Sequence, residues 1–283
     1  MECDRESFHE MADMLWRVVE IGPERARPVL LLHGFSGAGL FWEPIARAVP
    51  GIRSILPDLP GHAGTSAPEP WQAWDLGRAA SVIAGLLDRI GVGCCDIVGY
   101  SMGGRLALRY ALDHPGKTKT LTLVGASPGI DGEEERRMRI ASDDAWAERI
   151  EREGIESFAA AWEAQPLFAT QDRLPREVRD KMHALRLSHD PAALASAMRA
   201  FGTGRQESLI GRLADVSISV LLLAGSLDAK YREIMSTMAA RLARASLDIV
   251  DGSGHAVPLE KPAEFAERLE RFLEGHGGRR TDT

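Results

Sequence analysis

Cysteine is scarce in this chain of 283 residues, which contains only Cys3, Cys94 and Cys95. An odd number of cysteines, two of them adjacent, is a poor basis for a disulfide framework. The pattern fits a reducing compartment, and we therefore expect a cytoplasmic protein. Cys94 and Cys95 stand in an apolar stretch, so we predict that both are buried strand residues rather than metal ligands.

Long apolar runs and an excess of positive charge are also missing. No apolar run approaches the ~18 residues of a membrane-spanning helix, and residues 1–14 are too rich in Glu and Asp for a secretion signal. The chain has 34 Lys and Arg against 41 Asp and Glu, a net charge of -7, without the basic face of a nucleic-acid binder. We therefore expect neither a membrane nor a nucleic acid as partner, and the oligomeric state stays open.

Motifs for metals and nucleotides are absent as well. The histidine, cysteine and acidic residues show no spacing typical of metal ligands. The segment Gly37-Ala38-Gly39 lacks the third glycine of a dinucleotide-binding loop and the Gly-Lys-Ser/Thr of a phosphate loop. We therefore expect no metal and no cofactor.

Short apolar runs alternate with helical patterns along most of the chain. Predicted strands cover residues 15–21, 29–32, 54–56, 96–98, 121–124, 219–224 and 246–250. Predicted helices cover residues 41–49, 73–90, 102–112, 230–242 and 264–273. This alternation indicates an α/β protein with a mainly parallel central sheet and helices on both faces.

One segment interrupts the alternation, because its patterns are helical and contain no convincing strand. We therefore divide the chain into a first core part (1–126), a helical lid (127–212), a second core part (213–274) and a flexible tail (275–283). Such an insertion would lie over the carboxyl ends of the strands, where α/β proteins bind ligands.

The sharpest motif is Gly99-Tyr100-Ser101-Met102-Gly103, which matches G-x-S-x-G between a predicted strand and a predicted helix. That context is the one that a nucleophile elbow requires. The turn is so tight that the flanking positions must be small. It lifts the Ser101 hydroxyl out of the sheet and predicts a nucleophilic or basic serine.

A serine needs a base, and the base needs an orienting carboxylate. Asp228 and His255 each follow a predicted strand, and they come after the serine in the order acid, then histidine. We therefore assign Asp228 as the acid and His255 as the base. Asp251 is the alternative acid, although it stands only four positions before His255 and has the pattern of a turn residue.

Two backbone N–H groups are candidates for an oxyanion hole. His33-Gly34-Phe35 follows an early strand, and in enzymes with this elbow that loop supplies one donor while the residue after the serine supplies the other. The predicted donors are the N–H groups of Phe35 and Met102. We expect His33 to order the loop rather than to act as acid or base.

Arg105 stands one helical turn after Ser101, on the same face of the predicted helix. A buried guanidinium is costly without a partner. A substrate carboxylate is one candidate, since Arg binds carboxylates in a bidentate fork. A salt bridge to a carboxylate of the lid is the other.

The remaining histidines receive structural interpretations. His9 and His276 stand in segments that we expect to be flexible. His183 and His189 stand in the lid and are predicted to be solvated residues of helix faces.

Together, the elbow, the His-Gly loop, Asp58-Leu59-Pro60-Gly61-His62 and the Asp228/His255 pair resemble the α/β-hydrolase superfamily over nearly the whole chain. A narrower resemblance is to the synthases of menaquinone biosynthesis that make 2-succinyl-6-hydroxy-2,4-cyclohexadiene-1-carboxylate. The matching segments are His33-Gly34-Phe35-Ser36-Gly37, Gly99 to Arg105, Pro128-Gly129-Ile130, Glu135-Arg136, Arg139, Trp162, Gln165-Pro166-Leu167-Phe168, Leu185-Arg186 and Asp228-Ala229-Lys230-Tyr231. The lid matches weigh most, because lids normally diverge between hydrolase families.

The narrower resemblance implies elimination of pyruvate from a small substrate that carries three carboxylates. It implies that Ser101, activated by His255 and Asp228, removes a proton next to the succinyl carbonyl. The oxyanion hole would hold the charge on that carbonyl oxygen while the enolpyruvyl group leaves as pyruvate. The resemblance assigns substrate contacts to Tyr100, Arg105, Arg139, Trp162 and Arg186.

Two other functions remain compatible with the motifs. A carboxylesterase or carbon–carbon bond hydrolase on the same three residues would turn over simple esters and accumulate an acyl-enzyme. The arginines at 105, 139 and 186 argue against it, because it predicts an apolar pocket. A non-catalytic member of the fold ranks last, since serine, acid and histidine all stand in order.

Overall fold

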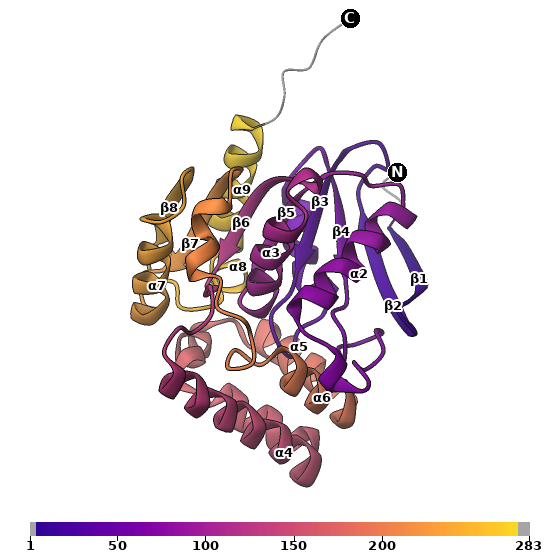
Figure 1. Ribbon diagram of the computed structural model, residues 1–283, viewed down its shortest axis with the longest axis vertical. Helices are drawn as coiled ribbons and strands as arrows, with labels where there is room; N and C mark the ends of the chain where they lie inside the picture. Colours follow the sequence, from indigo (N-terminus) through magenta and orange to yellow (C-terminus); the bar gives the residue numbers. More distant parts are fainter. Residues whose placement is uncertain (1–3, 277–283) are drawn as a thin grey trace, which may run out of the picture.

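A single sheet of eight strands organises the computed structural model, which describes residues 4–276 (Figure 1). The strands lie side by side in the order β1-β2-β4-β3-β5-β6-β7-β8. Their bounds are β1 Arg5–Met11, β2 Met14–Ile21, β3 Arg27–Leu32, β4 Ile52–Pro57, β5 Cys95–Tyr100, β6 Thr118–Val124, β7 Ser219–Gly225 and β8 Ala245–Val250. From β4 to β8 all neighbours pair in parallel, whereas β1 and β2 are antiparallel.

The central strands are largely buried and mostly apolar because helices cover both faces of the sheet. Ile97 and Val98 are adjacent in β5, and their side chains belong to cores on opposite sides. One core includes side chains of α2, α3 and α7, and the other includes side chains of α1 and α9. The predicted fold class, an α/β fold with a mainly parallel central sheet and helices on both faces, is therefore confirmed.

Helices and short 3₁₀ helices (η) occupy most of the remaining chain. The α-helices are α1 Glu43–Ala48, α2 Leu76–Arg89, α3 Met102–Asp113, α4 Glu133–Glu163, α5 Arg176–Leu187, α6 Pro191–Phe201, α7 Ala229–Ala239, α8 Val257–Glu260 and α9 Pro262–Gly275. The 3₁₀ helices are η1 Gly39–Trp42, η2 Trp71–Ala73, η3 Pro115–Lys117, η4 Pro166–Arg173 and η5 Ile210–Asp215.

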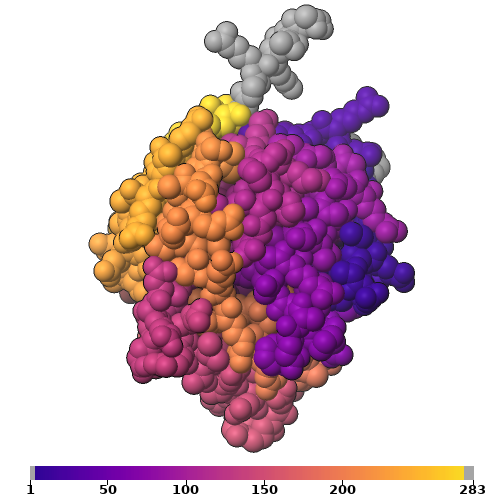
Figure 2. Space-filling view, in the orientation of Figure 1, coloured from indigo at the N-terminus to yellow at the C-terminus, as the bar shows by residue number. Residues whose placement is uncertain are grey.

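Between β6 and β7 the chain contains α4, α5 and α6 with η4 and η5, and no strand is described there. We call residues 127–212 the lid. Figure 1 shows its helices gathered at one end of the sheet, and Figure 2 shows the same segment as the lower part of the molecule. The lid has an apolar cluster of its own, which includes Ile150 and Phe158 of α4 and Leu194 of α6. It is therefore a packed unit and not a loose loop.

Several local expectations were wrong. His9 does not lie in a flexible segment, because β1 pairs it with Trp16 of β2. In β1 the exposed residues Glu6, Phe8 and Glu10 alternate with partly buried ones, as expected for an edge strand rather than a core strand. Cys95 is buried in β5, but Cys94 precedes the strand and is exposed.

The predicted start of the tail at residue 275 was also wrong. Gly275 is the last residue of α9, so it belongs to a helix. The rest of the predicted tail, from 277 onward, lies outside the described residues, as does Cys3. Within residues 4–276, no helix has both the length and the apolar character needed to cross a membrane.

Candidate active site

The turn between β5 and α3 holds Ser101 in a conformation that few L-residues adopt, with φ 52 and ψ -112. Gly99 and Gly103 flank the turn because there is no room for a side chain at either position. A Cβ on Gly103 would lie 2.2 Å from the carbonyl oxygen of Leu32, and a Cβ on Gly99 would lie 2.4 Å from the carbonyl oxygen of Gly103. Any side chain at Gly99 or Gly103 would therefore push these backbone segments apart and disturb the strained turn that holds Ser101.

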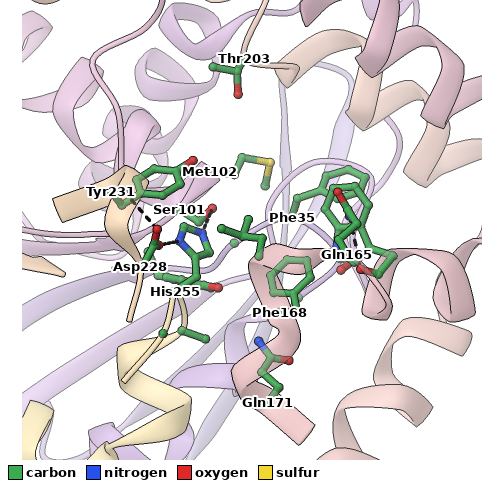
Figure 3. A pocket seen from close by; sticks show the side chains of 18 of the residues that line it. Phe35, Ser101, Met102, Gln165, Phe168, Gln171, Thr203, Asp228, Tyr231 and His255 are labelled. Carbon is green, nitrogen blue, oxygen red and sulfur yellow. Dashed lines mark hydrogen bonds and ion pairs between the residues drawn. The ribbon is translucent and has the colours of Figure 1, made fainter. Parts of the chain in front are cut away.

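The structure brings Ser101, His255 and Asp228 together in one chain of hydrogen bonds (Figure 3). His255 Nε2 lies 3.1 Å from Ser101 Oγ, and His255 Nδ1 lies 2.9 Å from Asp228 Oδ2. The other oxygen of Asp228 accepts the N–H of Tyr231 at 3.1 Å. A carboxylate held in this way fixes the imidazole with Nε2 toward the serine.

Asp251, the alternative acid, lies outside this chain of hydrogen bonds. Its carboxylate accepts a hydrogen bond from the hydroxyl of Ser226 at 3.1 Å, in an exposed turn. Asp251 is therefore a turn residue, as its sequence pattern predicted.

Phe35 and Met102 line the same cavity as Ser101. Met102 is the first residue of α3, where a helix leaves its N–H groups unpaired. Within residues 4–276, neither the N–H of Phe35 nor that of Met102 donates a hydrogen bond. Both are therefore available to an oxygen bound beside Ser101.

A cavity of about 500 Å³ lies between the carboxyl ends of the strands and the lid. Ser101 and His255 form part of its wall on the core side. The lid contributes three aromatic side chains to it, Trp146, Trp162 and Phe168. The ring of Phe168 lies near that of His255, with ring centres 6.2 Å apart, and Figure 3 shows Phe35 farther from the histidine. Four cationic side chains also line the cavity: Arg105, Arg139, Arg186 and Lys230.

Arg105 is buried with neutral partners only. Its guanidinium donates to the carbonyl oxygen of Phe201 at 2.7 Å and to Oε1 of Gln206 at 2.9 Å. No Asp or Glu of the described residues forms an ion pair with it, so the salt bridge to a lid carboxylate that we considered does not form. Burial lowers the pKa of Arg105 to about 10, which still leaves it charged at neutral pH.

Arg139 and Arg186 reach the cavity from the lid, and each is paired with an acidic side chain. Arg139 in α4 donates to Asp143 at 2.7 Å, and the buried Arg186 in α5 donates to Glu163 at 2.9 Å. Within the described residues, the Nε of Arg186 is buried without a hydrogen-bond partner. The lid acids therefore hold the two arginines at the cavity and leave a donor of Arg186 unused.

Tyr100 and Trp162 are the aromatic members of the predicted set. Tyr100 stacks on Phe41 with ring centres 5.3 Å apart, and burial raises its pKa, so its hydroxyl stays protonated. Trp162 packs against Phe35 with ring centres 5.3 Å apart. Its indole N–H is buried and has no partner among the described residues. Every residue of the predicted site thus lies at this one cavity.

His189 was predicted to be a solvated residue on a helix face, and this prediction was wrong. It is buried, lies in the turn between α5 and α6, and contacts the loop that contains Phe35. A signal was present, because Asp190 and Pro191 are a typical start of a helix. A residue just before that start stands in a turn and not on a helix face. His183, by contrast, is in α5 as expected, where it contacts Glu163.

Within residues 4–276, no group of three or more His, Cys, Asp or Glu side chains is placed to hold a metal ion. The polar groups that converge on the cavity are instead hydroxyl, imidazole, guanidinium and backbone N–H. Such a set can move a proton, stabilise a developing oxyanion and bind carboxylates.

Comparison with known proteins agrees with this architecture. Residues 27–262 match the α/β hydrolase fold family. The solved structure of MenH from S. aureus superposes with a TM-score of 0.86 at 29% identity, covering 96% of this chain and 99% of that one.

Several relatives of similar length carry the name 2-succinyl-6-hydroxy-2,4-cyclohexadiene-1-carboxylate synthase. The protein from Serratia proteamaculans is 33% identical over 90% of this chain and 96% of its own length. The protein from Klebsiella pneumoniae subsp. pneumoniae is 31% identical over 87% of this chain and 93% of its own length. The chain therefore belongs to the α/β hydrolase fold family and, within it, to the 2-succinyl-6-hydroxy-2,4-cyclohexadiene-1-carboxylate synthases.

Proposed function

We propose that this chain is a lyase of menaquinone biosynthesis. It converts 2-succinyl-5-enolpyruvyl-6-hydroxy-3-cyclohexene-1-carboxylate into 2-succinyl-6-hydroxy-2,4-cyclohexadiene-1-carboxylate and releases pyruvate. The observation that carries the proposal is the buried Arg105 guanidinium, which has neutral partners only and borders the cavity beside Ser101. A buried charge of this kind is stabilised when a carboxylate of the substrate binds it.

The reaction begins with removal of a proton next to the succinyl carbonyl. The hydroxyl of Ser101 passes its proton to Nε2 of His255, and the resulting alkoxide takes the proton from carbon. Asp228 stabilises the imidazolium that forms, because its carboxylate lies 2.9 Å from Nδ1. No bond forms between the serine and the substrate, so no acyl-enzyme is needed.

The negative charge then develops on the carbonyl oxygen of the substrate. The free N–H groups of Phe35 and Met102 are the donors for that oxygen, and one such donor is worth about 3 kcal/mol of barrier lowering. As the electrons return, a carbon–carbon double bond forms in the ring and the bond to the enolpyruvyl oxygen breaks. The enolate that leaves takes a proton and becomes pyruvate.

The substrate's three carboxylates match the cationic lining of the cavity. Arg105 offers a charge without an anionic partner, and Arg186 offers a buried Nε donor. Arg139 is more exposed and remains paired with Asp143. Trp162 adds an apolar face and an unpaired N–H, and Tyr100 adds a neutral hydroxyl. We assign these three arginines, Trp162 and Tyr100 as substrate-binding residues. The proposal also includes a cytoplasmic location for the enzyme.

Release of pyruvate by the purified protein tests this function. The substrate is generated in situ, because it eliminates spontaneously, and that background is subtracted. We expect Ser101→Ala to lower the catalysed rate by at least about a thousandfold while far-UV circular dichroism stays unchanged. Release no faster than background would contradict the lyase function. A burst of p-nitrophenol from simple esters would then favour the carboxylesterase, whose acyl-enzyme accumulates.

A further inference from the structure

Three buried histidines hold three successive peptide groups of the loop that contains Phe35. His33 Nδ1–H donates to the carbonyl oxygen of Gly34 at 2.8 Å. His62 Nε2 accepts the N–H of Ser36 at 3.1 Å, and His189 Nε2–H donates to the carbonyl oxygen of Ser36 at 3.1 Å. The three histidines come from the end of β3, from the loop after β4 and from the lid.

The other ring nitrogen of each histidine is also used, which settles the tautomers. Leu59 N–H donates to Nε2 of His33 at 2.9 Å, and Nδ1–H of His62 donates to the carbonyl oxygen of Pro60 at 3.0 Å. The N–H of Ala63 donates to Nδ1 of His189 at 3.1 Å. Every ring therefore carries one proton, and each bridges the loop to a second segment.

These bonds determine the direction of the Phe35 N–H. That N–H shares a planar trans peptide with the carbonyl of Gly34, so the two point in opposite directions. The carbonyl of Gly34 accepts hydrogen bonds from His33 and from the N–H of Gly37 at 3.1 Å. The Phe35 N–H is thereby turned away from these partners, toward the cavity that Phe35 lines.

The following residue, Ser36, makes this arrangement dependent on the lid. Its φ is 58, a left-handed conformation that costs free energy for a residue with a side chain. Both the N–H and the carbonyl of Ser36 are held, by His62 and His189 respectively. Of these two histidines only His189 comes from the lid, and this residue is 4% exposed.

We propose that His189 is a positioning residue for the oxyanion hole, through which the lid holds the Phe35 N–H in its working direction. The inference rests on the proposed function, because it assigns a task to the lid in stabilising the developing oxyanion. The imidazole touches neither Ser101 nor the cavity, so it acts only through the loop. If the lid moved His189 away, the carbonyl oxygen of Ser36 would lose this hydrogen bond, and the strained backbone of Ser36 could relax.

Two substitutions separate the two bonds of His189. In His189→Asn the side-chain oxygen replaces Nδ1 and keeps the bond from Ala63, but nothing reaches the carbonyl of Ser36. In His189→Gln the amide nitrogen reaches the place of Nε2 and keeps the bond to Ser36. Asp190→Ala is the matched control, since it removes the cap of α6 that accepts the N–H of Ala193 and leaves both histidine bonds intact.

The first readout is the steady-state kinetics of pyruvate release. We expect His189→Asn to lower kcat by about tenfold with KM nearly unchanged, because a misdirected donor affects only the transition state. We expect His189→Gln to keep most of kcat. Asp190→Ala is expected to lower the Tm and to leave kcat unchanged. Equal kcat values for the Asn and Gln variants, or the same kcat loss in Asp190→Ala, would overturn the inference.

The second readout does not depend on the identity of the substrate. A fluorophosphonate probe phosphonylates the serine and needs none of the substrate's carboxylates. Ser101 Oγ attacks its phosphorus, His255 takes the serine proton, fluoride leaves, and the phosphonyl oxygen occupies the oxyanion hole. Intact-mass spectrometry gives the rate constant of this step. A tenfold slower reaction of His189→Asn, with His189→Gln near wild type, supports the inference even if wild type releases no pyruvate. Equal rate constants in all variants would overturn it.

Discussion

Arg105 shows how a single residue combines a cost in folding with a gain in binding. Its charge is buried against a carbonyl and an amide oxygen, and burial lowers its pKa. Neutral partners compensate a buried charge less well than a carboxylate does. In the free enzyme the Arg105 guanidinium therefore lacks an anionic partner, and a carboxylate of the proposed substrate would supply one.

Replacing Arg105 tests that reasoning directly. We expect Arg105→Met to raise KM for the tricarboxylate by about 10- to 100-fold, which corresponds to a charged hydrogen bond of about 1.5–3 kcal/mol. We expect the Tm to stay equal or to rise, since the variant no longer buries a charge. Steady-state pyruvate release and thermal unfolding measure the two effects.

The control at this scale is Arg137→Met, because Arg137 lies on the exposed side of α4 and pairs with Glu133 and Glu134. Exposed pairs contribute about 0–1 kcal/mol, so both KM and Tm should stay near wild type. An Arg105→Met enzyme with the KM of the control would contradict a carboxylate-binding role for Arg105.

At the scale of elements, the strand–turn–helix unit of β5 and α3 depends on close approach between backbones. Gly103 lies so near β3 that a Cβ would be 2.2 Å from the carbonyl oxygen of Leu32. That oxygen belongs to a strand in the middle of the sheet, which cannot move aside without disturbing its neighbours. The elbow is thus held by packing against β3 as well as by its own turn.

We expect Gly103→Ala to lower the free energy of unfolding by about 3 kcal/mol, at the upper end of the range for overpacked sites. Urea-induced unfolding followed by circular dichroism measures the change. Gly116→Ala is the matched control, because a Cβ there meets no atom within 4 Å and its φ is not left-handed. If both variants unfold at the same urea concentration, the steric account of the elbow is wrong.

At the scale of the whole molecule, the buried histidines make stability depend on pH. Burial lowers the pKa of His33 to about 4 and that of His62 well below its ordinary value. Asp58 partly opposes the effect at His33, and His189 adds to it. Between pH 6.5 and pH 4 the unfolded chain binds more protons at these sites, so stability falls as the pH falls.

For His33 alone, we expect a loss of about 2 kcal/mol in the free energy of unfolding between pH 7 and pH 5. His33→Asn should show a flatter dependence on pH across this window, although it is less stable at pH 7. Urea titrations at both pH values measure the difference. Leu30→Ala serves as the control, since it removes buried volume from β3, which directly precedes His33, without a titrating group. A pH dependence in His33→Asn as steep as that of Leu30→Ala would contradict the prediction.

Local sequence determined the fold class and the order of the key residues. The strands are apolar runs, and Ser101, Asp228 and His255 each follow one, so chain order alone placed them at one edge of a parallel sheet. The structure brings those three side chains together, and their catalytic roles remain a prediction. The family was recognisable for the same reason, because its motifs are short and contiguous.

Only the tertiary structure decided which partners the polar side chains meet. Arg105 faces a carbonyl rather than a lid carboxylate, and His189 lies in the interior rather than on a helix face. β1 forms by antiparallel pairing with the edge of β2, although the sequence of β1 contains several charged residues. For Arg105 and His189 the deciding contact joins residues far apart in the chain, and neither periodicity nor spacing carries information about such contacts.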